Sequence, residues 1–234
     1  MRALLFDLDG TLTRSGGTGS RALGKALHAR PQAVAELRKM RLDGMTDRAI
    51  ARIVLAAEGD VSRPIEERMR GVAESEIEAT LARYLEALEV ECAKSGYEPQ
   101  PGVPGLLERL RPRKDVLLGL CTGNLERGAQ LKLASAGLWG DFRFGGYGSD
   151  AEPRPDIVRV AWRRAQALGA TSGLVIGDTP RDVLAAHEAG LPACGVATGR
   201  FTVQELLTHG AEMVLPDFRD VLESERLLLG PLTR

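Results

Sequence analysis

The chain has 234 residues, of which 44% are hydrophobic, so it can bury a sizeable core and is not expected to be disordered. Its 32 acidic and 31 basic residues nearly cancel, which argues against a nucleic-acid partner held by bulk positive charge. The apolar runs fall short of the ~18 residues that a membrane-spanning helix needs, and two early aspartates interrupt any signal region, so we expect a cytoplasmic protein without membrane contact.

Short apolar runs alternate with helical patterns through most of the chain. Runs of this length suit buried strands, and the amphipathic stretches between them suit helices packed on both faces of a sheet. The alternation predicts an α/β fold with a Rossmann-like, three-layer core and a central parallel sheet. The predicted strands cover 2–8, 115–121, 173–177, 193–197 and 212–215, with a weaker candidate at 142–147. The predicted helices cover 103–111, 124–137, 155–169, 180–190, 202–209 and 217–229.

Residues 15–98 interrupt this alternation. They contain no convincing strand, and helical periodicity is clear at 74–94. The stretch ends in a segment rich in proline and glycine at 97–105, which is typical of a linker. We therefore expect residues 1–14 and 99–234 to form the α/β core, with residues 15–98 inserted as an all-helical cap domain.

Two aspartates follow the first predicted strand, in the sequence FDLDGT at 6–11. Because side chains alternate along a strand, Asp7 and Asp9 point the same way, at the carboxyl end where open parallel sheets bind ligands. Their mutual repulsion is costly unless a cation or a proton intervenes. An Asp-Gly pair after a strand can also be a simple turn, but that reading leaves Asp7, inside an apolar run, unexplained.

A second acidic cluster, GDTPRD at 177–182, follows another apolar run and supplies Asp178 and Asp182. Taken alone, Asp178 could be an ordinary helix cap. If both strands are central in one sheet, the carboxylates of the two clusters converge. Hard oxygen ligands without a nearby histidine or cysteine favour Mg²⁺.

A third polar segment, CTGN at 121–124, lies between these clusters and directly follows a predicted strand. Thr122, Gly123 and Asn124 could form a small cradle for an anion at a strand-to-helix turn. The alternative is a simple helix N-cap by Thr122 or Asn124.

These three segments resemble the motifs of the haloacid dehalogenase (HAD) superfamily in order and spacing. FDLDGT is similar to its first motif, CTGN to its second and GDTPRD to its fourth, and the helical insertion matches the cap of the α-helical type. The turn in RLDGMTDRAI at 41–50 resembles that of phosphoglycolate-phosphatase-like members. There, Arg41, Asp43 or Arg48 could reach the substrate, unless Thr46 is only a helix N-cap.

The third motif of the family usually holds a lysine before a proline, and this chain has no lysine after Lys132. Arg154, followed by Pro155, stands at the expected place, so we assign it that role. An arginine can chelate phosphate oxygens, which makes the replacement chemically reasonable.

The resemblance implies phosphoryl transfer through an aspartyl-phosphate. Asp7 would be the nucleophile, and Asp9 would be the general acid and then the base that activates water. Mg²⁺ would be held by Asp7, by Asp178 and by the backbone carbonyl of Asp9, with Asp182 as a further ligand or an orienting group. The phosphate would be bound by Thr122, Gly123, Asn124 and Arg154.

We therefore expect a Mg²⁺-dependent phosphatase that hydrolyses a small organic phosphate monoester resembling phosphoglycolate or a sugar phosphate. Its partner would be a small phosphorylated metabolite, and the chain would be a monomer or a homodimer. The alternatives on the same fold are a phosphotransferase similar to β-phosphoglucomutase, and a pyrophosphatase.

Overall fold

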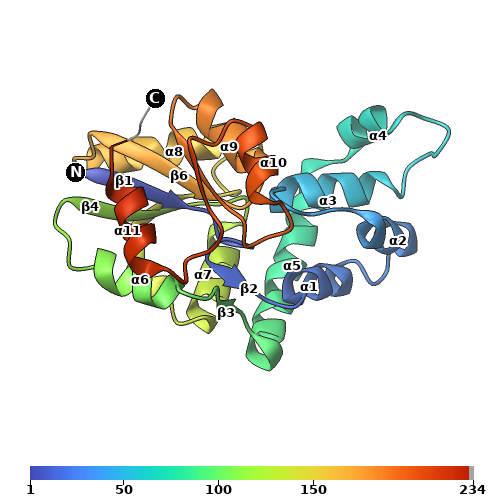
Figure 1. Ribbon diagram of the computed structural model, residues 1–234. Coiled ribbons are helices and arrows are strands. Elements are labelled where there is room, and N and C mark those ends of the chain that lie inside the picture. Colours follow the sequence, from blue (N-terminus) through green and yellow to red (C-terminus); the bar gives the residue numbers. More distant parts are fainter. Residues whose placement is uncertain (232–234) are drawn as a thin grey trace.

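The computed structural model describes residues 1–231 and contains a six-stranded sheet in which all paired strands are parallel (Figure 1). The sheet has the order β5-β4-β1-β6-β7-β8. Its strands are β1 (Arg2–Phe6), β4 (Val116–Cys121), β5 (Phe144–Gly146), β6 (Ser172–Gly177), β7 (Ala193–Val196) and β8 (Met213–Leu215). Since β1 lies between β4 and β6, three predicted site segments leave the sheet side by side. The predicted α/β fold with a parallel central sheet is confirmed.

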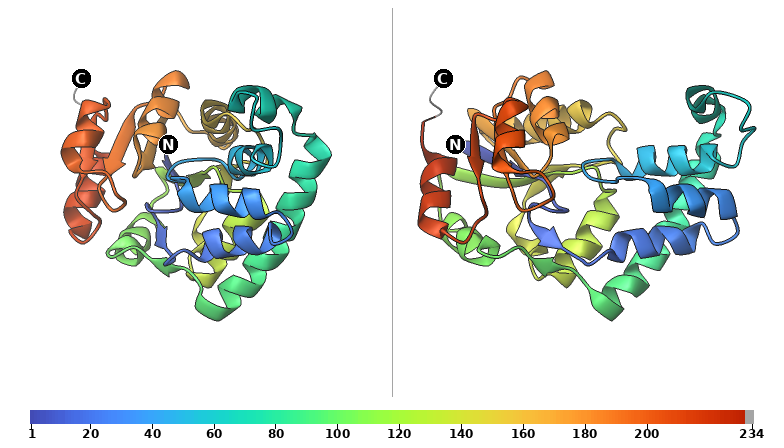
Figure 2. Two further views of the ribbon diagram at one scale, coloured as in Figure 1. Left: turned by 90° about the vertical axis from the view of Figure 1, so that its right-hand side faces the viewer. Right: turned by 45° about the vertical axis from the view of Figure 1, so that its right-hand side comes forward.

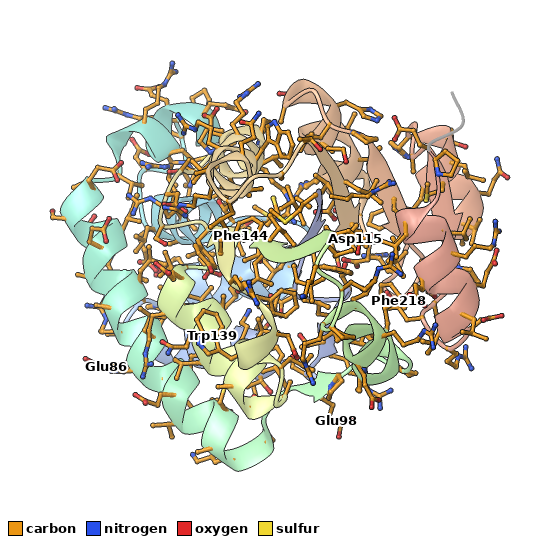
Figure 3. The ribbon with its side chains drawn as sticks, turned by 90° about the vertical axis from the view of Figure 1, so that its left-hand side faces the viewer. Glu86, Glu98, Asp115, Trp139, Phe144 and Phe218 are labelled. Atoms are coloured by element: carbon orange, nitrogen blue, oxygen red, sulfur yellow. The ribbon has the colours of Figure 1, made fainter. Side chains whose placement is uncertain are left out.

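Helices cover both faces of the sheet, because alternate residues of β1 enter different cores. Leu4 and Phe6 belong to one core, and Ala3 and Leu5 belong to the other. Phe218 packs on the first face, 6.5 Å from Phe6 between ring centroids (Figure 3). The helices over the first face are α6 (Val103–Leu110), α7 (Glu126–Ser135) and α11 (Val221–Leu229), and those over the second are α8 (Arg154–Ala167) and α9 (Pro180–Glu188). A short 3-10 helix, Trp139–Asp141, precedes β5, and α10 (Val203–Thr208) packs against β7 and β8.

Five helices lie beyond the carboxyl ends of the strands and form the cap (Figures 1 and 2). They are α1 (Thr18–Ala26), α2 (Pro31–Lys39), α3 (Asp47–Ala56), α4 (Ile65–Gly71) and α5 (Glu74–Ser95). They bury a core of their own, in which Leu27, Val54, Ile77 and Leu88 are almost fully enclosed. α5 has 22 residues, yet neither it nor any other helix within residues 1–231 is both long and apolar enough to cross a membrane.

A two-stranded antiparallel ribbon carries the chain into and out of the cap. It pairs β2 (Thr13–Arg14) with β3 (Glu98–Pro99), and Arg14 forms an ion pair with Glu98 at 3.0 Å. The predicted boundaries at 14/15 and 98/99 lie in this ribbon, and the division of the chain into two domains stays a prediction.

Candidate active site

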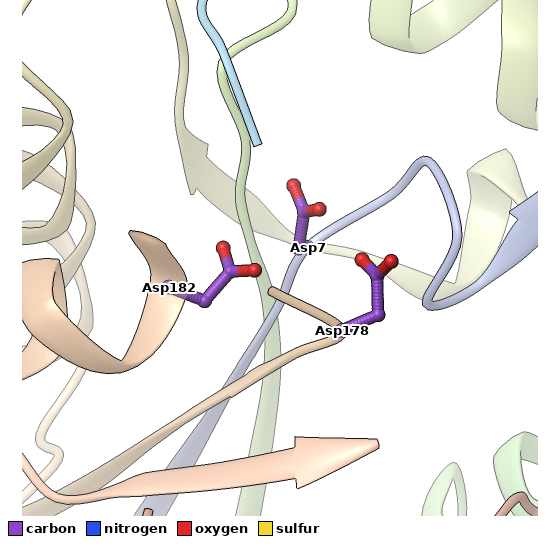
Figure 4. Close-up of side chains that lie close together, drawn as sticks. All are labelled: Asp7, Asp178 and Asp182. Atoms are coloured by element: carbon purple, nitrogen blue, oxygen red, sulfur yellow. The ribbon is translucent and has the colours of Figure 1, made fainter. Parts of the chain in front are cut away.

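Three carboxylates meet at the carboxyl end of the sheet (Figure 4). Asp7 follows β1, Asp178 follows β6, and Asp182 lies in the first turn of α9. Each offers an oxygen within 4.8 Å of the other two, and all three residues are buried. They meet because β1 and β6 are neighbours in register, and the backbone N–H of Asp7 donates to the carbonyl of Ile176 at 2.8 Å. The predicted convergence of the two acidic segments is therefore present in the structure.

Hydrogen bonds hold two of these carboxylates in place. The hydroxyl of Thr11 donates to Asp178 Oδ1 at 3.2 Å, and the backbone N–H and hydroxyl of Thr179 donate to Asp182 Oδ2 at 3.0 and 2.8 Å. Gly10 has a φ of +88°, and a Cβ there would lie 2.4 Å from Asp178 Oδ2. A glycine is needed at this position both for the backbone conformation and for the approach of Asp178.

The electrostatics of the cluster favour a bound cation. Burial raises the pKa of Asp7 to about 6, against the lowering effect of Arg154, and the nearby Asp182 and Asp9 raise it further. Burial likewise raises the pKa of Asp178 well above its usual range, with help from Asp182 and Asp7. Asp7 and Asp178 thus resist losing their protons, and a hard divalent cation bound to their oxygens would replace those protons.

Arg154 is the basic residue closest to the three carboxylates. Its Nη2 lies 2.9 Å from Asp7 Oδ1 and also contacts Asp182, while its Nη1 donates to the cap carbonyl of Gly44 at 3.2 Å. The side chain is only 9% exposed, so these contacts take place away from bulk solvent. Burial acts to lower the pKa of Arg154, but Asp182 and Asp7 outweigh it and raise the pKa. The structure thus places Arg154 beside Asp7 and Asp182, and phosphate binding by Arg154 stays a prediction.

Asp9 lies apart from the group of three. Its Oδ2 accepts a hydrogen bond from Asn124 Nδ2 at 2.8 Å, and the same amide nitrogen donates to the hydroxyl of Thr122 at 2.8 Å. Thr122 and Asn124 follow β4, next to β1, which explains how the second predicted segment reaches the first. The carboxylate of Asp9 is 45% exposed and lines the cavity under the cap. Asp7 lines the same cavity but is far more buried, with a side chain that is 5% exposed.

Lys132 is a site residue that the sequence interpretation missed. Its Nζ lies 2.7 Å from Asp9 Oδ2 and also donates to Asn124 Oδ1. Burial acts to lower the pKa of Lys132, but Asp9, Tyr84 and Tyr97 outweigh it and raise the pKa well above its usual value. A signal was present in the helical spacing: Lys132 lies three residues after the buried Ala129, so the two side chains share the inner face of α7.

The cap contacts the core directly at Gly123. Its carbonyl accepts a hydrogen bond from the backbone N–H of Asp47 at 2.9 Å, and a Cβ on Gly123 would lie 2.5 Å from the carbonyl oxygen of Met45. The Asp47 carboxylate accepts in turn from the backbone N–H of Leu125 at 2.9 Å. Burial raises the pKa of Asp47 to about 6, against the lowering effect of Lys132. Gly123 thus allows the cap to contact the core closely, and its binding of phosphate stays a prediction.

The candidate substrate residues of the cap divide into two groups. Asp43 lines the cavity, whereas Arg41 lines a neighbouring one and is absent from the lining of the first. Arg48 pairs with Glu74 at 2.7 Å and is not among the lining residues. The predicted N-cap role of Thr46 is confirmed, because its hydroxyl accepts a hydrogen bond from the backbone N–H of Ala49 at 3.2 Å at the start of α3.

The parallel sheet, the carboxylates clustered at its strand ends and the helical cap define a Rossmann-like α/β protein with a capped acidic site. A family model for haloacid dehalogenase-like hydrolases matches residues 1–190, and the chain belongs to this family. The resemblance carried by the sequence motifs is thereby confirmed.

Several known proteins are similar to the chain. It is 30% identical to a phosphoglycolate phosphatase from Rhodospirillum rubrum over 226 residues, which cover 93% of this chain and 88% of that protein. It is 32% identical to IndB, a probable phosphatase from Dickeya dadantii, over 137 residues, or 55% of this chain and 59% of that protein. The solved structure of a hydrolase from Pseudomonas syringae superposes with a TM-score of 0.71 at 26% identity, covering 95% of this chain and 97% of that one. With the family match, these relatives identify the chain as a hydrolase of phosphate esters.

Proposed function

We propose that the chain is a Mg²⁺-dependent phosphatase that hydrolyses a small organic phosphate monoester through an aspartyl-phosphate. The observation that carries this proposal is the arrangement at the strand ends. Asp7 lies in a cluster of three carboxylates, and Asp9 faces the adjoining cavity two residues later. One carboxylate can attack phosphorus while the other serves the leaving oxygen, which is the division of labour that this reaction requires.

The donor set fits Mg²⁺. Asp7, Asp178 and Asp182 offer only oxygen atoms, and no histidine or cysteine belongs to this group among the described residues. The ion would be held by these carboxylates and by the backbone carbonyl of Asp9. When bound, it would offset the negative charge of the phosphoryl group and of the carboxylates around it.

Each step of the reaction is assigned to residues of the chain. A carboxylate oxygen of Asp7 bonds to phosphorus as the bond to the leaving oxygen breaks, and Asp9 gives that oxygen its proton. Asp9 then takes a proton from a water that attacks phosphorus, so Asp7 is released and inorganic phosphate forms. Thr122, Asn124 and Arg154 would donate hydrogen bonds to the transferring oxygens.

The substrate would be a small phosphorylated metabolite, since the cavity that Asp7 and Asp9 line has a volume of about 260 Å³. The full-length relative from Rhodospirillum rubrum is named as a phosphoglycolate phosphatase. This name supports a phosphoglycolate-like substrate, and sugar phosphates belong to the same class of small monoesters.

The test is release of inorganic phosphate from a panel of phosphate monoesters and pyrophosphate, with Mg²⁺ and with EDTA. We expect turnover that disappears with EDTA and in Asp7→Asn, which keeps the shape of the side chain but not its nucleophilicity. Product analysis separates hydrolysis from transfer, because a mutase yields an isomerised sugar phosphate without free phosphate. Turnover that survives in Asp7→Asn would refute the proposed mechanism.

A further inference from the structure

The wall that the cap contributes to the cavity carries no positive charge. Among the described residues that line the cavity, those from the cap are apolar, hydroxylated, acidic or glycine. The apolar ones include Leu23, Leu42 and Ile50, and the acidic ones are Asp43 and Asp47. The part of a substrate that extends away from the strand ends therefore meets carbon, hydroxyl groups and two carboxylates.

The basic residues of the cap that lie nearest are held elsewhere. Glu91 on α5 pairs with Arg21 at 3.0 Å and with Lys25 at 2.6 Å. Arg52, like Arg48, pairs with Glu74, at 2.7 Å. These ion pairs bind the cap helices to one another rather than facing the cavity.

Two arginines of the core contact Asp43. Arg181 donates to the backbone carbonyl of Asp43 at 3.1 Å, and Arg200 lies 3.6 Å from its carboxylate. Together with Arg41 they line a separate cavity, to which Asp43 also belongs. Asp43 therefore stands between these arginines and the ligand cavity.

The two cations inside the cavity are also paired. Arg154 contacts Asp7 and Asp182, and Lys132 contacts Asp9. The cavity lining thus holds two cations against the five carboxylates of Asp7, Asp9, Asp43, Asp47 and Asp178. The proposed Mg²⁺ would add positive charge at the strand ends, beside Asp7 and Asp178, but within residues 1–231 the cap side of the cavity would still offer only Asp43 and Asp47 as charged groups. A negative charge at the far end of the leaving group would therefore have no free partner there, and an unpaired charge withdrawn from water is strongly disfavoured.

We propose that the leaving group of the substrate is an uncharged, hydroxylated carbon chain, such as a polyol or a sugar, and that a carboxylate at its far end is rejected. This inference rests on the proposed function and narrows it, because it selects sugar-like phosphates over phosphoglycolate. The hydroxyl groups of Ser20, Tyr84 and Tyr97 can bond to the substrate's hydroxyls, while Leu23 and Ile50 pack against its carbon atoms. Gly19 leaves room for these groups, since a Cβ there would lie 3.0 Å from the Tyr97 hydroxyl.

The test compares esters that differ mainly in the charge at the far end. The pairs are 2-hydroxyethyl phosphate with 2-phosphoglycolate, glycerol 3-phosphate with 3-phosphoglycerate, and glucose 6-phosphate with 6-phosphogluconate. We expect kcat/KM for the neutral member of every pair that is turned over to exceed that of the carboxylate by about 100-fold or more. A carboxylate member that is turned over as well as its partner, or better, overturns the proposal.

A generic aryl ester separates failure of this inference from failure of the proposed function. If neither p-nitrophenyl phosphate nor any of the six esters is hydrolysed in a reaction that needs Asp7, the proposed function fails and this inference fails with it. If p-nitrophenyl phosphate is hydrolysed but none of the six esters is, the proposed function stands and only the inference of a hydroxylated leaving group is refuted.

A charge introduced into the cap wall gives a second test. Leu42 lines the cavity and, only partly buried, packs against the cap core, so Leu42→Arg places a cation there with a partial loss of packing that Leu42→Gln shares. We expect this variant to raise kcat/KM for the carboxylate esters relative to the neutral ones by about tenfold, because the carboxylate gains a partner. Leu42→Gln, a polar change without charge, is the matched control and should leave the ratio unchanged. An equal ratio in both variants would refute the electrostatic reason for the selectivity.

Discussion

Replacing Gly123 with alanine tests whether close contact between cap and core is needed for activity. The added Cβ would lie 2.5 Å from the carbonyl oxygen of Met45 and 2.8 Å from Cα of Thr46, whereas ordinary contact begins at 3.4 Å. The cap would have to move by roughly 0.9 Å, since both atoms belong to the backbone and no flexible side chain can yield. Gly123 has no positive φ, so alanine causes no strain in its own backbone.

Two consequences follow from this displacement in Gly123→Ala. The hydrogen bond from Asp47 to the Gly123 carbonyl is weakened, which costs about 1 kcal/mol and lowers the melting temperature by about 2–4 °C. A shift of about 1 Å in groups that position the substrate can cost on the order of 100-fold in rate, so we expect kcat/KM to fall by about 10- to 100-fold. The assay is Mg²⁺-dependent phosphate release from the best ester of the panel, with thermal unfolding measured in parallel.

Gly128→Ala is the matched control for this prediction. Gly128 lies within α7, and its added Cβ would meet Leu85 at 3.5 Å and Asp47 at 3.7 Å, both ordinary contacts. Alanine is favoured over glycine inside a helix by roughly 0.5–1 kcal/mol, so this variant should be slightly more stable and equally active. The reasoning is refuted if Gly123→Ala keeps kcat/KM within about twofold of the parent protein.

Three further predictions concern the charged groups. Arg154→Met removes the arginine that pairs with the buried carboxylates of Asp7 and Asp182, so it should destabilise the metal-free protein by about 3–5 kcal/mol. Mg²⁺ should raise the melting temperature of this variant more than that of the parent protein. Because burial raises the pKa of Asp7 to about 6 and that of Asp178 well above its usual range, the folded state binds protons that the unfolded state has released. The stability of the metal-free protein should therefore fall as pH rises from about 4 to above 6. The gain in melting temperature from Mg²⁺ should grow over the same range. An equal gain at about pH 5 and pH 8 would contradict this expectation. Lys132→Met removes the partner of Asp9 and should lower kcat by about 10- to 100-fold while calorimetry finds Mg²⁺ affinity within about twofold, since Lys132 does not contact the three carboxylates.

The fold could be predicted largely from the sequence because each central strand is buried on both faces. Such strands appear as continuous apolar runs, as in 116–121, where every residue is buried. The ribbon of β2 and β3 could not be predicted in this way. Each of its strands has two residues, and Pro99 occupies one of the four positions, so neither periodicity nor strand propensity indicates it.

The candidate site was predictable where its residues follow strands or, like Arg154 and Asp182 at helix starts, match a family motif, and not where they lie on helices outside such motifs. Asp7, Thr122 and Asp178 each follow a buried strand, and neighbouring parallel strands bring such residues together. Lys132 and Asp47 lie on α7 and α3, and their contacts depend on how those helices pack. The ion pair of Lys132 with Asp9 joins residues 123 positions apart, and no local pattern specifies that distance.

The two interior cations are divided between the two proposed catalytic carboxylates. The family resemblance implies a single basic residue near the nucleophile, whereas here Arg154 on α8 pairs with Asp7 at 2.9 Å and Lys132 on α7 pairs with Asp9 at 2.7 Å. The side chain of Asp7 is 5% exposed and that of Asp9 is 45% exposed. Because the two pairs come from different helices, each carboxylate is oriented separately. Asp7 is thereby held deep beside Asp178 and Asp182. Asp9 is held facing the cavity, where it can give its proton to the leaving oxygen.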